Sequence, residues 1–220
     1  MRARPVSLRI ERQMLRAGAG SVAGIDEVGR GALCGPTTVA AVVVGPRTST
    51  APRGVRDSKD LSARSRQALV PLIGSWALAT AVDHASAAEI DEFGIVAALG
   101  LAGRRALAAL PVVADAVLLD GSHDYLTATS DRCEPPDEGL PPVRTVIKAD
   151  RQCASVAAAS ILAKCARDAI MIDLAVDHVD YGWAQNKGYA SAQHVAALAR
   201  LGPTSQHRRT WRLPGVPTGP

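Results

Sequence analysis

Short apolar runs alternate with segments of helical periodicity along most of the chain. Residues 38–44 are apolar on both faces, which is typical of a central strand. The apolar run at residues 22–25 precedes it, and a turn rich in Gly and Pro at residues 29–36 joins the two. Further strands are predicted at residues 75–82, 116–120 and 143–149.

The remaining periodic segments predict helices, three of which begin at a serine that can cap the first turn. We expect helices after Ser62, after Ser86 and after Ser191, and Ser86 and Glu89 have the spacing of a capping box. The longest helical pattern covers residues 151 to about 178 and is rich in Ala in its first half. Strands come first and then alternate with helices, so we predict an α/β fold with helices on the faces of a mixed sheet.

Length and composition add modest constraints. A chain of 220 residues is long enough for one domain with a substantial core. Three Trp, three Tyr and one Phe are too few to fill that core, so we expect it to be aliphatic. The formal net charge of +4 suits a polyanionic partner without requiring one.

Several segments are expected to lie outside regular structure. Residues 1–20 form a basic N-terminal segment with five arginines and no apolar core of signal-peptide length. Residues 122–142 are predicted to be a long exposed loop, and residues 214–220 a disordered tail. No apolar run approaches the roughly 20 residues of a membrane span. The four cysteines include no C-x-x-C pair, so we expect buried free thiols and a reducing cytoplasm.

Acidic residues follow three of the predicted strands. Asp26 and Glu27 end the first, Asp120 ends the run at 116–120, and Asp150 follows the last. Ligands of such sheets gather beyond the carboxyl ends of the parallel strands, so four carboxylates could meet there and hold two divalent ions. Hard oxygen ligands favour Mg²⁺ or Mn²⁺ over zinc.

Each acid also has a simpler explanation when it is taken alone. Asp120 could belong to a turn, Asp150 could cap the following helix, and Asp26 with Glu27 could be half-exposed. Neighbouring strand residues also point to opposite faces, so Asp26 and Glu27 cannot both reach one metal pair from a regular strand. We therefore expect a break at the end of this strand that lets Glu27 swing round.

The motifs that contain these acids, together with further motifs along the chain, closely resemble, in order, those of the type 2 ribonucleases H, the bacterial ribonuclease HII family. The similarity covers roughly residues 21 to 212. The motifs are Gly24-Ile25-Asp26-Glu27-Val28-Gly29-Arg30-Gly31, Asp57-Ser58-Lys59, Leu119-Asp120-Gly121, Lys148-Ala149-Asp150, residues 155–164, Arg167-Asp168, Lys187-Gly188-Tyr189 and His207-Arg208-Arg209.

This resemblance implies a ribonuclease H-like fold at residues 21–213, a mixed five-stranded sheet flanked by helices with a C-terminal helical extension. It implies an endonuclease that cuts the RNA strand of RNA–DNA hybrids and nicks duplex DNA on the 5′ side of a single embedded ribonucleotide. The products would carry a 5′-phosphate and a 3′-hydroxyl. The expected partners are these nucleic acids and no membrane, and the protein is expected to act as a monomer.

The resemblance also implies residue roles. Asp26, Glu27, Asp120 and Asp150 look like the catalytic acids that bind two Mg²⁺ or Mn²⁺ ions, with Asp26 bridging them. Gly29, Arg30 and Gly31 resemble the loop that recognises the ribose 2′-hydroxyl through its backbone, and Tyr189 the tyrosine that packs on the following deoxyribose. Ser58, Lys59 and Lys164 resemble phosphate contacts.

Simpler explanations exist for the substrate residues as well. Lys59 could be a solvated charge and Tyr189 a half-buried aromatic at a turn. His207-Arg208-Arg209 could be a phosphate-facing patch or simply a basic tail, and the N-terminal arginines would add at most salt-sensitive attraction.

Two other functions fit parts of the pattern. One is a different two-metal enzyme on a similar sheet, such as a DNA nuclease or resolvase. The other is a noncatalytic nucleic-acid-binding module, but that function should be accompanied by the loss of an acid, and none is lost.

Overall fold

The computed structural model describes residues 5–128 and 139–216. Its centre is a five-stranded sheet in the order β3-β2-β1-β4-β5. The first three strands along the chain pair antiparallel, whereas β4 and β5 extend the sheet in parallel from β1. The mixed five-stranded sheet is thereby confirmed. The strands are β1 (Val22–Val28), β2 (Thr37–Val44), β3 (Ala79–Ala85), β4 (Ala116–Asp120) and β5 (Val143–Val146).

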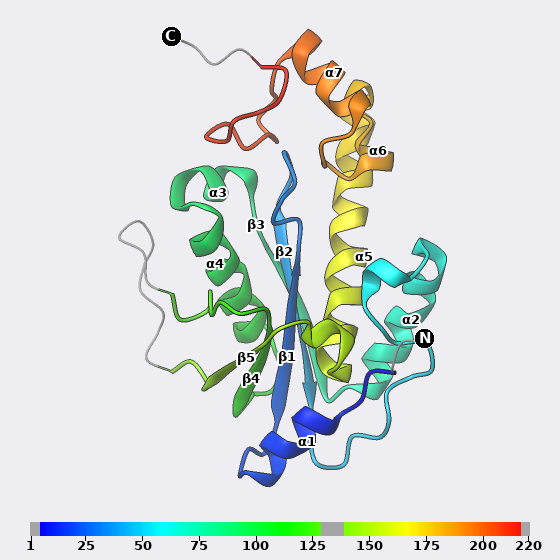
Figure 1. The fold of residues 1–220 in the computed structure, drawn as a ribbon, viewed down its shortest axis with the longest axis vertical. Helices are drawn as coiled ribbons and strands as arrows, with labels where there is room; N and C mark the ends of the chain where they lie inside the picture. Colours follow the sequence, from blue (N-terminus) through cyan, green and yellow to red (C-terminus); the bar gives the residue numbers. More distant parts are fainter. Residues whose placement is uncertain (1–4, 129–138, 217–220) are drawn as a thin grey trace.

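Helices cover both faces of this sheet (Figure 1). α4 packs on β2 and β3 on one face, and α5 crosses β1 and β2 on the other. The core is accordingly split into aliphatic clusters on the two sides. The helices are α1 (Arg9–Arg16), α2 (Ala63–Trp76), α3 (Ala87–Phe93), α4 (Ile95–Ala108), α5 (Ala154–Asp177), α6 (Trp183–Asn186) and α7 (Ala192–Leu201), with 3-10 turns η1 (Ser58–Asp60), η2 (Ala149–Arg151) and η3 (Val179–Tyr181). None of the described helices is long and apolar enough to cross a bilayer.

The predicted serine caps are confirmed. Ser62 and Ser191 accept hydrogen bonds from the first turns of α2 and α7, and Ser86 forms a complete capping box with Glu89. The helical pattern after Ser86 is divided, however, because Gly94 adopts a φ of 80° between α3 and α4. A left-handed residue cannot continue the helix, so the chain turns there.

Two strand predictions are wrong at their ends. The strand expected at residues 75–82 begins at Ala79, because α2 continues to Trp76. The strand expected at residues 143–149 ends at Val146, and the chain then enters η2 through Lys148, whose φ is 56°. Asp150 therefore lies in a 3-10 turn and not at a strand end.

The N-terminal segment contributes a helix that the sequence pattern does not reveal. Ile10 of α1 and its N-cap residue Leu8 pack in one cluster with Val22 at the start of β1. The fully buried Glu11 accepts hydrogen bonds from Ser155 N–H (2.9 Å) and Ser155 Oγ (2.8 Å). Ser155 belongs to the first turn of α5, where backbone N–H groups have no partner within the helix. Glu11 thus caps the central helix from another element.

The loop after β4 is not wholly exposed, contrary to the prediction. Tyr125 and Leu126 are buried in the core beside α4. The part at residues 129–138, with Cys133, lies outside the described residues, as do residues 217–220 of the predicted tail. Of the described tail residues, Val216 packs against the C-terminal cluster around α7. Cys34, Cys153 and Cys165 are free, and the first two are buried.

We expect Glu11→Ala to lower the free energy of unfolding by about 1–3 kcal/mol, because it leaves buried Ser155 donors without an acceptor. For a chain of this size the melting temperature should fall by about 2–4 °C per kcal/mol. Thermal unfolding of the variant beside Glu92→Ala, which removes an exposed acid, measures this. Equal melting temperatures for the two variants would show that α1 does not stabilise α5.

Candidate active site

Asp26 lies on β1 with its side chain toward α5. Its cross-strand neighbour is Ala40, which packs with α5 residues, and cross-strand neighbours share a face of the sheet. Asp26 is 6% exposed, and its Oδ1 accepts the N–H of Glu27 (2.8 Å). The first candidate acid is therefore buried and held in place by the backbone that follows it.

Asp120 and Asp150 meet on the same side of the sheet. Alternation along β4 places Asp120 on the face of Leu118, which packs against the start of α5. Asp120 Oδ1 accepts the backbone N–H groups of Ala149 (2.6 Å) and Asp150 (3.5 Å). Asp150 does not cap α5, because Cys153 occupies the N-cap position. The carboxylate of β4 thus fixes the turn that carries Asp150.

Glu27 remains on the opposite face. The expected strand break is absent, because β1 stays paired with β2 through Glu27 and on to Val28. The side chain shares its face with Ile25, and its Oε2 accepts a long hydrogen bond from the buried Tyr125 hydroxyl (3.4 Å). Glu27 therefore approaches the other acids from the far side of the same sheet end.

Burial, and then repulsion from neighbouring acids, raises the pKa of three of the four carboxyl groups. Burial, followed by repulsion from Glu27 and Asp120, raises the pKa of Asp26 well above its ordinary value. Burial and Asp120 raise the pKa of Glu27. Burial and Asp120 likewise raise the pKa of Asp150 to about 6. Burial and repulsion thus both favour the protonated forms of Asp26, Glu27 and Asp150, whose pKa values they raise.

Few positive groups offset this charge. Lys59 Nζ lies 3.9 Å from Asp150 Oδ2, and Arg30 lies 4.0 Å from Glu27 Oε1. Burial opposes the charge of Lys59, but Asp57, Asp26 and Asp150 together raise its pKa. Both cationic side chains are more than half exposed, so their compensation is screened by water.

The donor set can hold divalent cations. Four carboxylates supply the hard oxygen ligands that Mg²⁺ and Mn²⁺ prefer, and their mutual repulsion leaves a deficit of positive charge. The four carboxylates are nevertheless spread apart. Among the described residues, the one group of three His, Cys, Asp or Glu residues whose ligand atoms all lie within 4.8 Å of one another is Cys34, His194 and His207. Cations bound here would have to draw the carboxylates closer together.

The Gly29-Arg30-Gly31 loop follows β1 directly and rests on two fully buried arginines. Arg208 donates to the carbonyl oxygens of Gly29 (2.6 Å) and Arg30 (2.8 Å). Arg167 donates to the carbonyl oxygens of residues further along the loop, Cys34 (3.0 Å) and Pro36 (2.8 Å). Both arginines therefore hold the loop through its carbonyl groups.

The glycines of this loop differ in what they require. Gly29 has a φ of 89°, and a Cβ there would lie 2.2 Å from Arg167 Nε. Gly31 is exposed, and a Cβ there would meet nothing within 4 Å. The fold itself demands glycine at position 29 but not at position 31.

The other predicted substrate residues lie in different surroundings. Tyr189 is 37% exposed and rests over the Arg167 guanidinium. Ser58 is buried and donates its N–H to Ser160 Oγ (3.1 Å), next to the exposed Lys59. Lys164 pairs with Asp168 and lines a groove of about 410 Å³.

Three contacts around the candidate site were not predicted from the sequence pattern. Asp57 accepts the N–H of Lys59 and pairs with Arg151, and these contacts order the turn that carries Lys59. The spacing Asp-x-Lys could have suggested that Asp57 caps this turn. Tyr125 lies in a segment that has no period. Both interpretations of His207-Arg208-Arg209 are wrong for His207 and Arg208, because these two residues are buried. Only Arg209 is exposed.

Comparison with known proteins identifies the family of this chain. The family model for ribonuclease HII matches residues 23–213. A ribonuclease HII from Streptomyces avermitilis is 49% identical over 210 residues, which cover 94% of this chain and 84% of the relative. One from Nitrosococcus oceani is 47% identical over 191 residues, covering 87% and 88%.

Solved structures show the same fold. The ribonuclease H2 from Pyrococcus horikoshii OT3 aligns with a TM-score of 0.70 at 25% identity, covering 88% of this chain and 94% of that one. The ribonuclease HII of a PCNA complex from Archaeoglobus fulgidus aligns with a TM-score of 0.65 at 26% identity, covering 87% and 93%. A Bst-RNase HIII solved with Mn²⁺ has a TM-score of 0.70 at 24% identity, covering 93% and 70%. The chain therefore belongs to the ribonuclease HII family of metal-dependent endonucleases.

Proposed function

We propose that this protein, acting as a monomer, hydrolyses the RNA strand of RNA–DNA hybrids and nicks duplex DNA on the 5′ side of single ribonucleotides. The products would carry a 5′-phosphate and a 3′-hydroxyl. The observation that carries the proposal is the group of four carboxylates, two of them buried and two half-buried, beside a loop with exposed backbone at Gly31. The free Cys34, Cys153 and Cys165 are consistent with a reducing cytoplasm.

Asp26, Glu27, Asp120 and Asp150 are the proposed ligands of two Mg²⁺ or Mn²⁺ ions. Burial and then repulsion raise the pKa values of Asp26, Glu27 and Asp150, which supports this assignment because a bound dication would offset that repulsion. When bound, such ions supply an activated water and stabilise the charge on the leaving 3′-oxygen.

The chain's own residues position these acids. The N–H of Ala149 holds Asp120, the N–H of Glu27 holds Asp26, and the Tyr125 hydroxyl reaches Glu27. Each contact restricts one carboxylate before any cation binds, which lowers the ordering cost of assembling the site. Lys59, whose Nζ lies 3.9 Å from Asp150 Oδ2, is a proposed phosphate contact.

The proposed reading of the substrate depends on sugar shape. Exposed backbone at Gly31 leaves room for a ribose to approach, and the 2′-hydroxyl distinguishes RNA from DNA. Tyr189, half-exposed on Arg167, offers a flat ring to the following deoxyribose. Ser58 and Lys164 are proposed phosphate contacts, although Asp168 already neutralises Lys164.

A nicking assay tests the proposed function. Three duplexes are compared with Mg²⁺ and with Mn²⁺: a uniform RNA–DNA hybrid, a DNA duplex with one ribonucleotide, and an all-DNA duplex. We expect cleavage of the first two and none of the third. Cleavage of the all-DNA duplex would indicate a different two-metal nuclease.

We expect Asp26→Asn to lower cleavage by about 10³-fold or more, since metal ions supply several kcal/mol of transition-state stabilisation. Asn keeps the oxygen that accepts Glu27 N–H, so the fold should persist. Because burial and repulsion raise the pKa of Asp26, its ionisation costs stability as the pH rises through that pKa. Without metal, the variant should therefore have a melting temperature a few degrees above that of the wild type at pH 8, by about 2–4 °C per kcal/mol. At pH 3 the two melting temperatures should be the same.

The control is Asp60→Asn, which neutralises an exposed acid next to Lys59. It should change neither the cleavage rate nor the pH dependence of melting. Wild-type turnover by Asp26→Asn with Mg²⁺ would remove Asp26 from the mechanism.

We expect Gly31→Val to keep the wild-type melting temperature but to lower kcat/KM on the single-ribonucleotide duplex by about 10–100-fold, since small displacements at a reacting centre cost up to this much. Gly29→Ala should instead lower the melting temperature, because its Cβ collides with Arg167. Thermal unfolding and steady-state kinetics separate the two. Unchanged kinetics for Gly31→Val would refute close approach of the loop to the sugar.

A further inference from the structure

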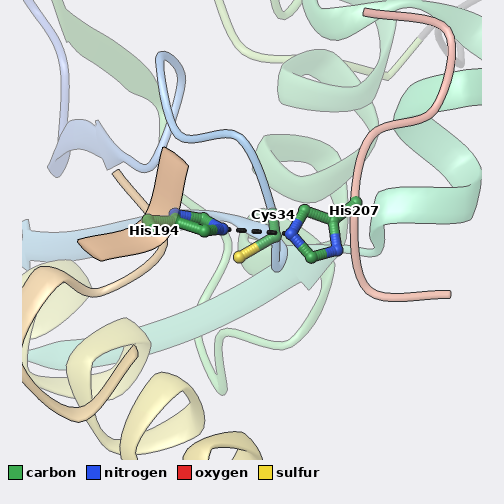
Figure 2. A group of neighbouring side chains, drawn as sticks. All are labelled: Cys34, His194 and His207. Atoms are coloured by element: carbon green, nitrogen blue, oxygen red, sulfur yellow. Dashed lines mark hydrogen bonds between the residues drawn. The ribbon is translucent and has the colours of Figure 1, made fainter. Parts of the chain in front are cut away.

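A second cluster of ligand-type side chains lies behind the Gly29–Gly31 loop. Cys34, His194 and His207 are all buried, and their ligand atoms lie within 4.8 Å of one another (Figure 2). Their elements are distant in the sequence: the loop after β1, the first turn of α7 and the segment that follows α7. A cluster of this kind can either bind a metal ion or orient the residues around it.

Hydrogen bonds fix the protons of both imidazole rings. Thr204 N–H donates to His207 Nδ1 (2.9 Å), so the proton of His207 is on Nε2. That proton points to His194 Nε2 (3.0 Å), and Trp183 Nε1–H (3.2 Å) shares the single lone pair of this nitrogen with it. His194 therefore carries its proton on Nδ1 and donates it to the carbonyl oxygen of Tyr189 (3.0 Å).

This pattern does not suit a metal ligand. Coordination through His207 Nε2 would move its proton to Nδ1, where it would face the N–H of Thr204. The guanidinium of Arg167 also binds the Cys34 carbonyl (3.0 Å), which places a buried positive charge beside the thiol. Burial and the neighbouring His194 lower the pKa of His207 to about 4, so the ring is neutral at physiological pH.

This series of hydrogen bonds ends at Tyr189, the residue proposed to contact the deoxyribose. It runs from Thr204 N–H through His207 and His194 to the carbonyl of Tyr189. The same carbonyl accepts Ser191 N–H (2.8 Å), so the peptide after the tyrosine is fixed from two sides. The turn before it is tight, with φ of 52° at Lys187 and 83° at Gly188.

The other end of this series of hydrogen bonds leads to the Gly29–Gly31 loop. His207 pairs with Cys34 in an isolated antiparallel bridge, and the next residue, Arg208, holds the carbonyls of Gly29 and Arg30. The histidine pair thus connects the two elements that are proposed to face the sugars on either side of the cleavage junction.

We propose that His194 is a positioning residue that sets the place of Tyr189 relative to the Gly29–Gly31 loop, and thereby the preference for an RNA–DNA junction, while His207 fixes the tautomer of the His194 ring. This inference rests on the proposed function. The pair acts through neutral rings of fixed tautomer and binds no metal.

A matched pair of variants at one position tests it. His194→Asn places an amide N–H where Nδ1–H stood and can still donate to Tyr189, whereas the amide of His194→Gln lies at the Nε2 position and cannot. The readout is kcat/KM on the single-ribonucleotide duplex divided by kcat/KM on a uniform RNA–DNA hybrid. Loss of folded protein alone would lower both values equally and leave this ratio unchanged.

We expect the ratio to fall about 5–10-fold in His194→Gln, the effect of one lost hydrogen bond, and to stay within about two-fold of wild type in His194→Asn. Wild-type ratios in both variants, or equal losses in both, would overturn the inference. If the wild-type protein fails to nick the ribonucleotide duplex at all, the proposed function fails instead.

A second measurement on the wild-type protein does not depend on the variants folding. Nitrogen–proton correlation spectra of the imidazoles should show the Nε2–H tautomer for His207 and the Nδ1–H tautomer for His194 near pH 7. Elemental analysis should find far less than one zinc per chain after incubation with zinc and desalting. The opposite tautomers, or one retained zinc per chain that is lost in His207→Gln, would overturn the inference.

Discussion

Repulsion among buried and half-buried carboxylates at one end of the sheet is the constraint around which the protein is built. Asp26, Asp120 and Asp150 lie toward α5, and Glu27 reaches the same end from the opposite face. The nearby cations Lys59 and Arg30 are mostly in water and offset little of this charge. The fold tolerates the repulsion because the backbone N–H groups of Glu27 and Ala149 hold Asp26 and Asp120 in place. Binding of two divalent cations would relieve this repulsion, and the relief would contribute to the free energy of cation binding.

The neighbouring loop is held in the complementary way. Arg167 and Arg208 are fully buried, and their guanidinium groups bind the backbone carbonyl oxygens of residues 29–36. This leaves the Gly31 backbone exposed beside the acids. A loop fixed through its carbonyls keeps its shape without a bound substrate, which is the condition for reading a single hydroxyl group.

The acids, the glycine loop and most elements were predictable from the sequence, because apolar runs and serine caps act locally. What was missed depends on distant partners. Glu11 becomes a helix cap only once α1 lies against α5, and Arg208 looks like part of a basic tail until it meets the carbonyls of Gly29 and Arg30. The expected strand break at Glu27 was wrong because pairing with β2 extends to Val28. No local pattern encodes these contacts.

Anomalous diffraction from crystals soaked in Mn²⁺ tests the central claim most directly. The claim predicts two manganese peaks between the carboxylates of Asp26, Glu27, Asp120 and Asp150, with Asp26 contacting both. Manganese bound only elsewhere, at Cys34, His194 and His207 for example, or ordered peaks that leave Asp26 without a metal contact, would contradict it.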